Sequence, residues 1–147
     1  MARSVWNTPR IVPGIAYKDV PKAAEWLSRA FGFRERIESR LSGTIPGRGE
    51  WSLTWIELDD GLIGLNTAGS GRSDCNGLKV YVDDIDRHFE RAKAAGATIT
   101  AQLEDKFWGG REYAAKDLEG HDWEFSARGR ELASADWKLP PGVKRHG

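Results

Sequence analysis

The feature that most constrains this chain is an internal repeat. The segment from Ile15 to Val20 matches the segment from Val80 to Ile85: each alternates like a strand and then reaches an acid, Asp19 or Asp84. An aspartate in this position can accept hydrogen bonds from the unpaired amides of a helix's first turn. Because a repeat fixes the architecture, the two halves are predicted to fold alike.

A helix is predicted to follow each of these aspartates. The helix over 20–31 has Pro21 in its first turn, where the missing N–H has no cost, and the second helix covers 85–95. Gly32 and Gly96 come directly after them and are predicted to end both helices in the left-handed conformation. Each half therefore begins as a strand followed by a helix.

Three strand-like segments follow each predicted helix, separated by turn residues. They cover 33–41, 51–58 and 62–66 in the first half and 97–103, 111–116 and 121–126 in the second. The stretches 43–49 and 68–76 are predicted to be loops. The fold class is α+β with two tandem βαβββ modules in one structural domain. The predicted parts are an N-terminal arm (1–9), module 1 (10–67), a linker (68–76), module 2 (77–127) and a C-terminal tail (128–147), loosely ordered apart from Trp137.

Composition excludes several classes of partner and site. Lys+Arg and Asp+Glu are 22 each in 147 residues, so no overall field would attract nucleic acid or an anionic membrane. The single cysteine, Cys75, excludes an internal disulfide and a Cys-based zinc cluster and fits a reducing compartment. No apolar run has the length of a signal peptide or a membrane span. We expect a cytoplasmic protein with neither a nucleic-acid nor a membrane partner.

Strand alternation predicts which side chains face the helices. The bulky face of the outer strands comprises Ile11, Ile15, Tyr17, Ile63, Leu65, Leu78, Val80, Val82, Trp123 and Phe125. The opposite face is small or polar and comprises Val12, Gly14, Ala16, Leu62, Gly64, Asn66, Gly77, Lys79, Tyr81, Asp122, Glu124 and Ser126. This second face is poor core material, because unpaired buried polar groups are costly. It predicts a concave, partly wet cavity, with a solvated sheet face as the alternative.

Several motifs in the chain resemble those of the vicinal oxygen chelate superfamily. They are GIAYKD at 14–19, VDDI at 82–85, AAGA at 94–97, FWGGREY at 107–113 and DLEGHDW at 117–123. This superfamily includes glyoxalase I, extradiol dioxygenases and bleomycin-resistance proteins. The resemblance covers about residues 10–126. It implies a cupped mixed sheet with helices on the convex face, and a homodimer.

In metal-using members of this superfamily, the first and last strands of each module each supply one ligand. By resemblance, these positions fall on Val12, Gly64, Gly77 and Glu124. One ligand of the four remains, and a single carboxylate does not hold a catalytic divalent ion. The resemblance therefore predicts the metal-free, bleomycin-resistance-like branch, with no metal and no cofactor.

The favoured function is sequestration of a small, planar organic molecule, as in antibiotic resistance. Tryptophan gives a large, rigid stacking surface, and the chain has seven. Trp108, between Phe107 and two glycines, is predicted to cover the ligand; Trp51 and Trp55 share one face of their strand, while Trp26 and Trp123 are assigned to the core. The predicted polar contacts are Lys79, Tyr81, Asn66 and Glu124 on the floor, with Arg111 at the rim.

An enzyme of the same fold is the alternative, although the sequence favours a binding protein. A metal-free lyase, isomerase or dioxygenase type would use Glu124 or His121 as general base. A metal-dependent enzyme would need ligands from non-standard positions. For His121, a turn histidine bonded to the backbone competes with the catalytic interpretation. An interaction module has no sequence feature in its favour.

Overall fold

The computed structural model describes residues 9–47, 49–67 and 77–146. Its contacts divide the chain into two compact units, each described below by itself. The first unit contains residues 1–76 and the turn 118–121, and the second contains residues 77–117 and 122–147. The predicted linker, the predicted arm apart from Pro9, and Cys75 lie outside the described residues. The predicted domain boundaries therefore stay predictions.

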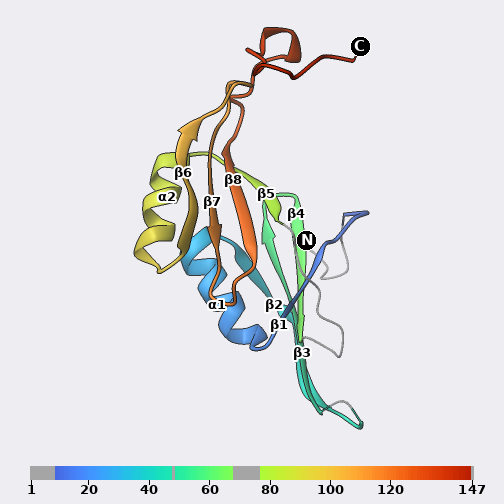
Figure 1. Ribbon diagram of the computed structural model, residues 1–147. Helices are drawn as coiled ribbons and strands as arrows, with labels where there is room; N and C mark the ends of the chain where they lie inside the picture. Colours follow the sequence, from blue (N-terminus) through green and yellow to red (C-terminus); the bar gives the residue numbers. More distant parts are fainter. Residues whose placement is uncertain (1–8, 48, 68–76, 147) are drawn as a thin grey trace. The chain divides into compact units, whose positions relative to one another are not determined.

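The first unit is a four-stranded mixed sheet with one helix. Its elements are β1 (Gly14–Tyr17), α1 (Val20–Phe31), β2 (Arg34–Ile45), β3 (Gly49–Leu58) and β4 (Gly61–Thr67). The strand order is β1-β4-β3-β2, with β1 parallel to β4 and the other pairs antiparallel. Figure 1 shows β2 and β3 as a long hairpin.

The second unit repeats this plan. Its elements are β5 (Leu78–Val82), α2 (Ile85–Ala94), β6 (Thr98–Asp105), β7 (Arg111–Lys116), β8 (Asp122–Ala127) and a short 3₁₀ helix, η1 (Ser134–Asp136). The strand order is β5-β8-β7-β6, and β5 is parallel to β8. Figure 1 shows α2 alongside β6 within this unit. The α+β class and the two βαβββ modules are thus confirmed.

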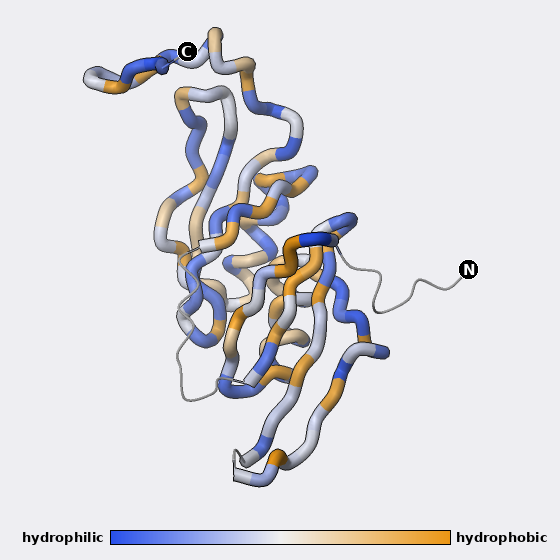
Figure 2. The backbone as a smooth tube through the Cα atoms, turned by 90° about the vertical axis from the view of Figure 1, so that its right-hand side faces the viewer, coloured by the Kyte–Doolittle hydropathy of each residue, from blue (hydrophilic) through white to orange (hydrophobic). Residues whose placement is uncertain are grey.

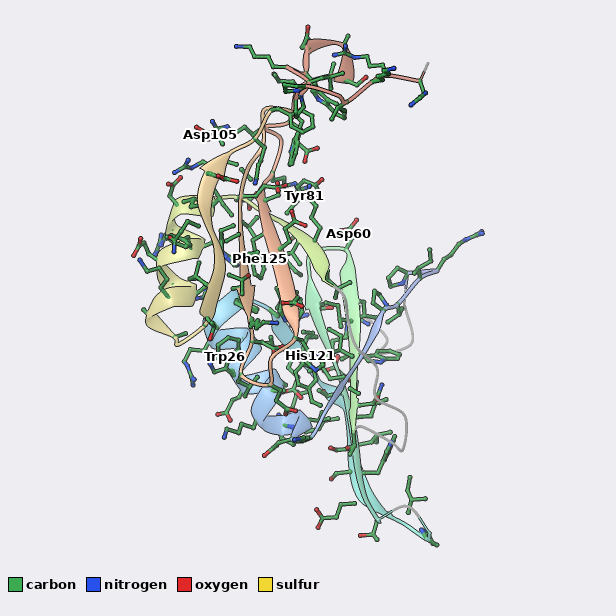
Figure 3. The ribbon with its side chains drawn as sticks, in the orientation of Figure 1. Trp26, Asp60, Tyr81, Asp105, His121 and Phe125 are labelled. Atoms are coloured by element: carbon green, nitrogen blue, oxygen red, sulfur yellow. The ribbon has the colours of Figure 1, made fainter. Side chains whose placement is uncertain are left out.

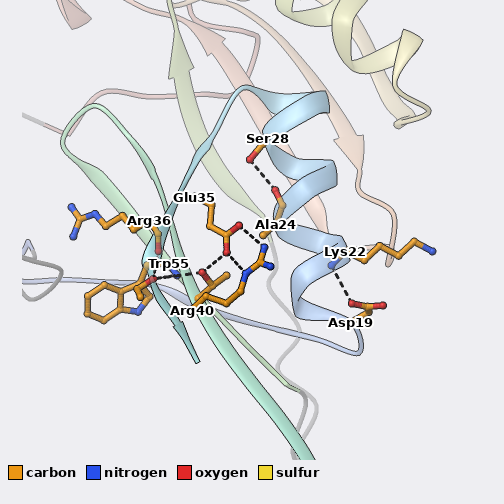
Figure 4. A network of polar contacts seen from close by, with 10 residues as sticks. Asp19, Lys22, Ala24, Ser28, Glu35, Arg36, Arg40 and Trp55 are labelled. Carbon is orange, nitrogen blue, oxygen red and sulfur yellow. Dashed lines mark hydrogen bonds and ion pairs between the residues drawn. The ribbon is translucent and has the colours of Figure 1, made fainter. Parts of the chain in front are cut away.

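Both helices begin as the repeat predicts. The carboxylate of Asp19 accepts a hydrogen bond from the amide of Lys22 at 3.1 Å (Figure 4). The carboxylate of Asp84 accepts one from the amide of Arg87 at 3.2 Å. Gly32 ends α1 with φ 84°. The second helix stops earlier than predicted: it ends at Ala94, and Gly96, with φ 94°, lies in the turn beyond it.

The core of each unit lies between the sheet and its helix. In the first unit Ile15, Tyr17 and Leu65 from the strands are fully buried, as is Leu27 from α1. In the second unit Phe125 of β8 stacks with both Trp123 of β8 and Tyr113 of β7, and α2 adds Phe89 and Ala92. Figure 2 shows hydrophilic and hydrophobic positions alternating along the strands. The assignment of Trp26 and Trp123 to the core is confirmed, since they are 8% and 1% exposed.

Three sequence expectations are wrong. Ile11 was assigned to the helix side, but it precedes β1 and is 82% exposed. The predicted loop over 43–49 is mostly strand, because β2 runs to Ile45 and pairs residue by residue with β3. The tail is not loose beyond Arg128: the guanidinium of Arg145, for example, donates to the carbonyl of Trp137 at 2.9 Å.

Membrane insertion by a helix finds no support in the described part of the chain. Neither α1, with 12 residues, nor α2, with 10, is long and apolar enough to span a bilayer.

Candidate functional site

The floor of the first unit is built around Gly64. In the sheet register Gly64 pairs with Gly14 on one side and with Trp55 on the other, and Asn66 follows on the same face. A Cβ atom at Gly64 would lie 3.3 Å from Nε1 of Trp55. The indole therefore lies across β4 at this glycine. Because Trp55 is only partly buried, the result is a flat aromatic surface of the kind that stacks on a planar molecule.

A bulge in β2 supports Trp55 from the neighbouring strand. The register between β2 and β3 shifts between Arg36 and Leu41. Within this shift the hydroxyl of Ser39 accepts the backbone N–H of Trp55 at 2.9 Å and donates to the carbonyl of Arg36 at 2.7 Å. The irregular backbone therefore has hydrogen-bond partners, which fixes the strand position from which Trp55 projects.

A buried ion pair lies beside this aromatic surface. Arg36 pairs across the sheet with Trp55, and its Nε donates to Glu57 at 2.5 Å; Arg34 bonds the other oxygen of Glu57. Arg36 and Glu57 are only 3% and 6% exposed. Burial alone would raise the pKa of the Glu57 carboxyl, but the hydrogen bonds from Arg36 and Arg34 outweigh it and lower this pKa. The sequence analysis missed these residues, although strand alternation places them on the face of Trp55.

Trp51 borders a separate hollow of the first unit. A cavity of about 460 Å³ lies between the start of α1 and the β2–β3 hairpin. Among the described residues that line this cavity, Trp51 is the only predicted binding residue. The rest of its wall is mostly polar: Lys18, Asp19, Val20, Pro21, Ser42, Gly43, Thr44, Glu50, Ser52 and Thr67.

In the second unit, the face away from α2 carries a charged cluster. Lys79 of β5 lies opposite Glu124 of β8, and Glu112 of β7 lies opposite Ser126 of β8. The ammonium of Lys79 lies 2.8 Å from Glu112, and the hydroxyl of Ser126 donates to the same carboxylate at 3.0 Å. Tyr81 is the next residue on this face, at the far end of β5 (Figure 3). Glu112, buried at 3% exposure, was missed because β7 reads as an ordinary amphipathic strand.

The pKa values of the Glu112 and Glu124 carboxyl groups are shifted in opposite directions. The hydrogen bond to Glu112, with burial, raises the pKa of Glu124. Burial would also raise the pKa of Glu112, but bonds from Lys79, Glu124 and Ser126 lower it. Two carboxyl groups in contact do not both ionise easily, so Glu124 keeps its proton to a higher pH than an isolated glutamate, while Glu112 is the counter-ion of Lys79.

Trp108 stands in a tight turn between β6 and β7. A Cβ at Gly110 would lie 2.5 Å from Nε1 of Trp108, and one at Gly109 would lie 2.5 Å from Leu132. The two glycines are therefore required for close packing. The Trp108 ring lies 5.3 Å from the ammonium of Lys79. Its buried N–H has no acceptor within the described part of the chain.

Arg111 and His121 do not join the charged cluster. Arg111 bonds Asp86 at 3.0 Å and Asp105 at 3.3 Å, on the face of β7 that carries Tyr113 rather than Glu112. Nε2 of His121 lies 2.8 Å from the carbonyl oxygen of Ala16, within the first unit. This contact is the backbone bond expected of a turn histidine.

The four superfamily ligand positions do not fit a metal ion. Val12, Gly64 and Gly77 have no donor side chain. Gly64 is in addition covered by the indole of Trp55. Glu124 is hydrogen-bonded to Glu112. Across the described ranges, no group of three or more His, Cys, Asp or Glu side chains has a metal-binding arrangement.

Comparisons with known proteins agree with this fold. TioX from Micromonospora sp. ML1 is 34% identical, with a TM-score of 0.64 over 85% of this chain and 100% of that chain. The fosfomycin resistance protein FosX from Listeria monocytogenes has a TM-score of 0.61 over 82% of this chain and 93% of that one; at 19% identity it shows the fold alone. Rv0887c from Mycobacterium tuberculosis is 43% identical over 55 residues, 37% of this chain and 32% of that protein, so the match spans about a third of its length. A family model described as the Glyoxalase/Bleomycin resistance protein/Dioxygenase superfamily matches residues 10–125. The chain belongs to this superfamily.

Proposed function

We propose that this protein binds and sequesters a small, planar organic molecule without the help of a metal ion. The observation that carries the proposal is the partly exposed Trp55 indole lying across Gly64, since an aromatic ring is a surface on which a planar molecule stacks. In a metal-using relative, the position of Gly64 would carry a metal ligand. Here a glycine makes room for an aromatic surface instead.

The charged cluster of the second unit contains fixed polar groups that can orient a ligand. Binding sites are mostly apolar but contain a few fixed polar groups that orient the ligand. Lys79 is held by the buried carboxylate of Glu112, and its ammonium lies 5.5 Å from the ring of Tyr81 and 5.3 Å from that of Trp108. We propose that Lys79, Tyr81, Trp108 and Glu124 are ligand contacts of the second unit. Asn66 and Trp55 are proposed ligand contacts of the first unit, considered by itself.

The superfamily and the relatives' names favour an antibiotic as the ligand. FosX is named a fosfomycin resistance protein, and bleomycin resistance appears in the name of the superfamily. We therefore propose a resistance-type role in the cytoplasm, with the protein acting as a homodimer. Purified protein should elute as a dimer in size-exclusion chromatography with light scattering.

Calorimetric titration with planar antibiotics and quinones tests binding. Replacing Trp55 by alanine removes the stacking surface, and we expect about tenfold weaker binding of any member that the parent binds, or ~1.4 kcal/mol. Trp26→Phe is the matched control, because Trp26 packs against Phe31 in the core, and its affinity should equal the parent's. Equal affinity of Trp55→Ala and the parent would contradict stacking. Stoichiometric metal in the purified protein, or loss of binding with a chelator, would contradict the metal-free part.

One observation favours a second candidate, an enzyme that uses Glu124 as a general base. A raised pKa brings a carboxyl group closer to the value at which it exchanges protons near neutral pH. Such an enzyme would exchange a proton beside the carbonyl of a ligand for deuterium from the solvent. The exchange should be seen by NMR with the parent and vanish in Glu124→Gln, whereas a binding protein shows none with either.

A further inference from the structure

The C-terminal tail packs onto the Trp108 turn within the second unit. The amide of Leu132 donates to the carbonyl of Trp108 at 2.8 Å, and that of Lys138 donates to the carbonyl of Phe107 at 3.4 Å. The Leu132 side chain fills the space beside Gly109, and the indole N–H of Trp137 donates to the carbonyl of Leu132 at 2.8 Å. These contacts fix the backbone that follows Glu131.

This packing places the carboxylate of Glu131 on the proposed binding residues. The hydroxyl of Tyr81 donates to Oε1 of Glu131 at 2.9 Å, and the ammonium of Lys79 lies 3.8 Å from the same oxygen. The bond to Glu131 is the first cause of the raised pKa of the Tyr81 hydroxyl, so Tyr81 stays protonated and remains a donor. Two donors from β5 therefore converge on one carboxylate oxygen.

The contact with Glu131 is exchangeable, unlike the one with Glu112. The side chains of Lys79 and Glu131 are both 35% exposed, whereas Glu112 is 3% exposed. Exposed ion pairs contribute only about 0–1 kcal/mol, while a buried carboxylate needs its cation. An incoming anion can therefore replace Glu131 on Lys79 and Tyr81 and leave the charge of the cluster unchanged.

We infer that Glu131 occupies the place of an acidic group of the ligand, so that the ligand class is a planar aromatic acid. This inference rests on the proposed function. The acid would accept from Tyr81 and Lys79, and its aromatic body would lie beside the rings of Tyr81 and Trp108, both of which are near the ammonium. A cationic ligand is disfavoured, because the ammonium of Lys79 already lies near both rings and would repel a second cation.

Calorimetry with three matched probes on the full chain tests the inference. The probes are 2-naphthoate, the neutral 2-naphthamide and the cationic 2-naphthylmethylamine. We expect the parent to prefer naphthoate. Glu131→Ala should strengthen naphthoate binding about two- to fivefold by removing the competing carboxylate, and leave naphthamide unchanged. Tyr81→Phe should weaken naphthoate alone. Glu90→Ala, which removes an exposed carboxylate from α2, is the control and should bind all probes like the parent.

The outcomes separate the two proposals. Naphthamide binding as tightly as naphthoate, or Glu131→Ala behaving like Glu90→Ala, would overturn the acid inference and leave the planar-ligand proposal standing. Tighter binding of the amine, weakened by Glu131→Ala, would show a cation site and also overturn it. If the protein binds none of the three probes and no compound of the panel of planar antibiotics and quinones, both proposals are overturned.

Discussion

Replacing Gly110 by alanine displaces Trp108 without changing its chemistry. Gly110 does not have a positive φ, so alanine adds no backbone strain there. Its Cβ, however, would lie 2.5 Å from Nε1 and 3.0 Å from Cδ1 of the indole. Real contacts of this kind are not that short. The rigid indole has to rotate away, because Gly110 lies in the buried turn that leads into β7.

The loss of stability can be calculated from the contacts that the displaced Trp108 ring gives up. Trp108 packs edge-to-face on Phe107 at 4.8 Å, which is worth about 0.5–1.5 kcal/mol, and lies near the ammonium of Lys79, worth about 0.5–1 kcal/mol. Overpacking a filled site costs about 1–3 kcal/mol. We therefore expect the free energy of unfolding to fall by about 2 kcal/mol in Gly110→Ala.

Urea unfolding followed by circular dichroism measures this loss, and ¹⁵N spectra of the indole N–H groups report whether Trp108 moves. Gly43→Ala is the matched control: Gly43 also lacks a positive φ, and no atom lies within 4 Å of its added Cβ. Its change should stay within about 0.5 kcal/mol. A loss in Gly110→Ala no larger than in this control, with the Trp108 resonance unmoved, would refute the packing of Trp108 on Gly110.

Two further predictions concern buried carboxyl groups. The pKa of Glu124 is raised above its ordinary 4.5, so its stabilising contribution is present below that pH and is lost as the pH rises through the raised value. Glu124→Gln should therefore gain stability over the parent between pH 4 and pH 7 in thermal denaturation, and a pH-independent difference would contradict the contact with Glu112. Glu57→Gln should lower the free energy of unfolding by about 3–5 kcal/mol, since it removes the carboxylate charge of a buried ion pair with Arg36; a loss below 1 kcal/mol in urea titration would contradict a stabilising role of this pair.

The repeat made the fold predictable because its signals are local. Asp19 and Asp84 act on amides three residues away, so their spacing alone locates both helix starts. Alternation then assigned Trp123 and Phe125 to the helix side correctly. It failed for Ile11, because parity identifies a face only inside a strand. Pro13 intervenes there, and β1 begins at Gly14.

The contacts within each candidate surface join residues that are far apart in the chain, and local sequence patterns do not predict such contacts. Glu131 reaches Tyr81 across 50 residues, from a tail that has no periodicity at all. Arg36 and Glu57 look like solvent-facing charges in sequence, and the bulge beside Arg36 has no sequence signature. The sequence alone does not show what lies against the two glycines beside Trp108. In the structure they are small because an indole and a leucine lie against them.

The repeat also shows how the two halves differ on their first and last strands. In each unit the first strand pairs in parallel with the last, and the residues that face each other are Gly14 with Gly64 in one and Lys79 with Glu124 in the other. The first pair has no side chains, and the indole of Trp55 covers Gly64. The second pair is charged, and the ammonium of Lys79 forms an ion pair with Glu112. A catalytic metal site normally needs three protein donors, and these two pairs supply a single carboxyl side chain, that of Glu124. At these matched positions the first module therefore presents an indole and the second a charged cluster, so the same strand pairing carries different chemistry in the two halves.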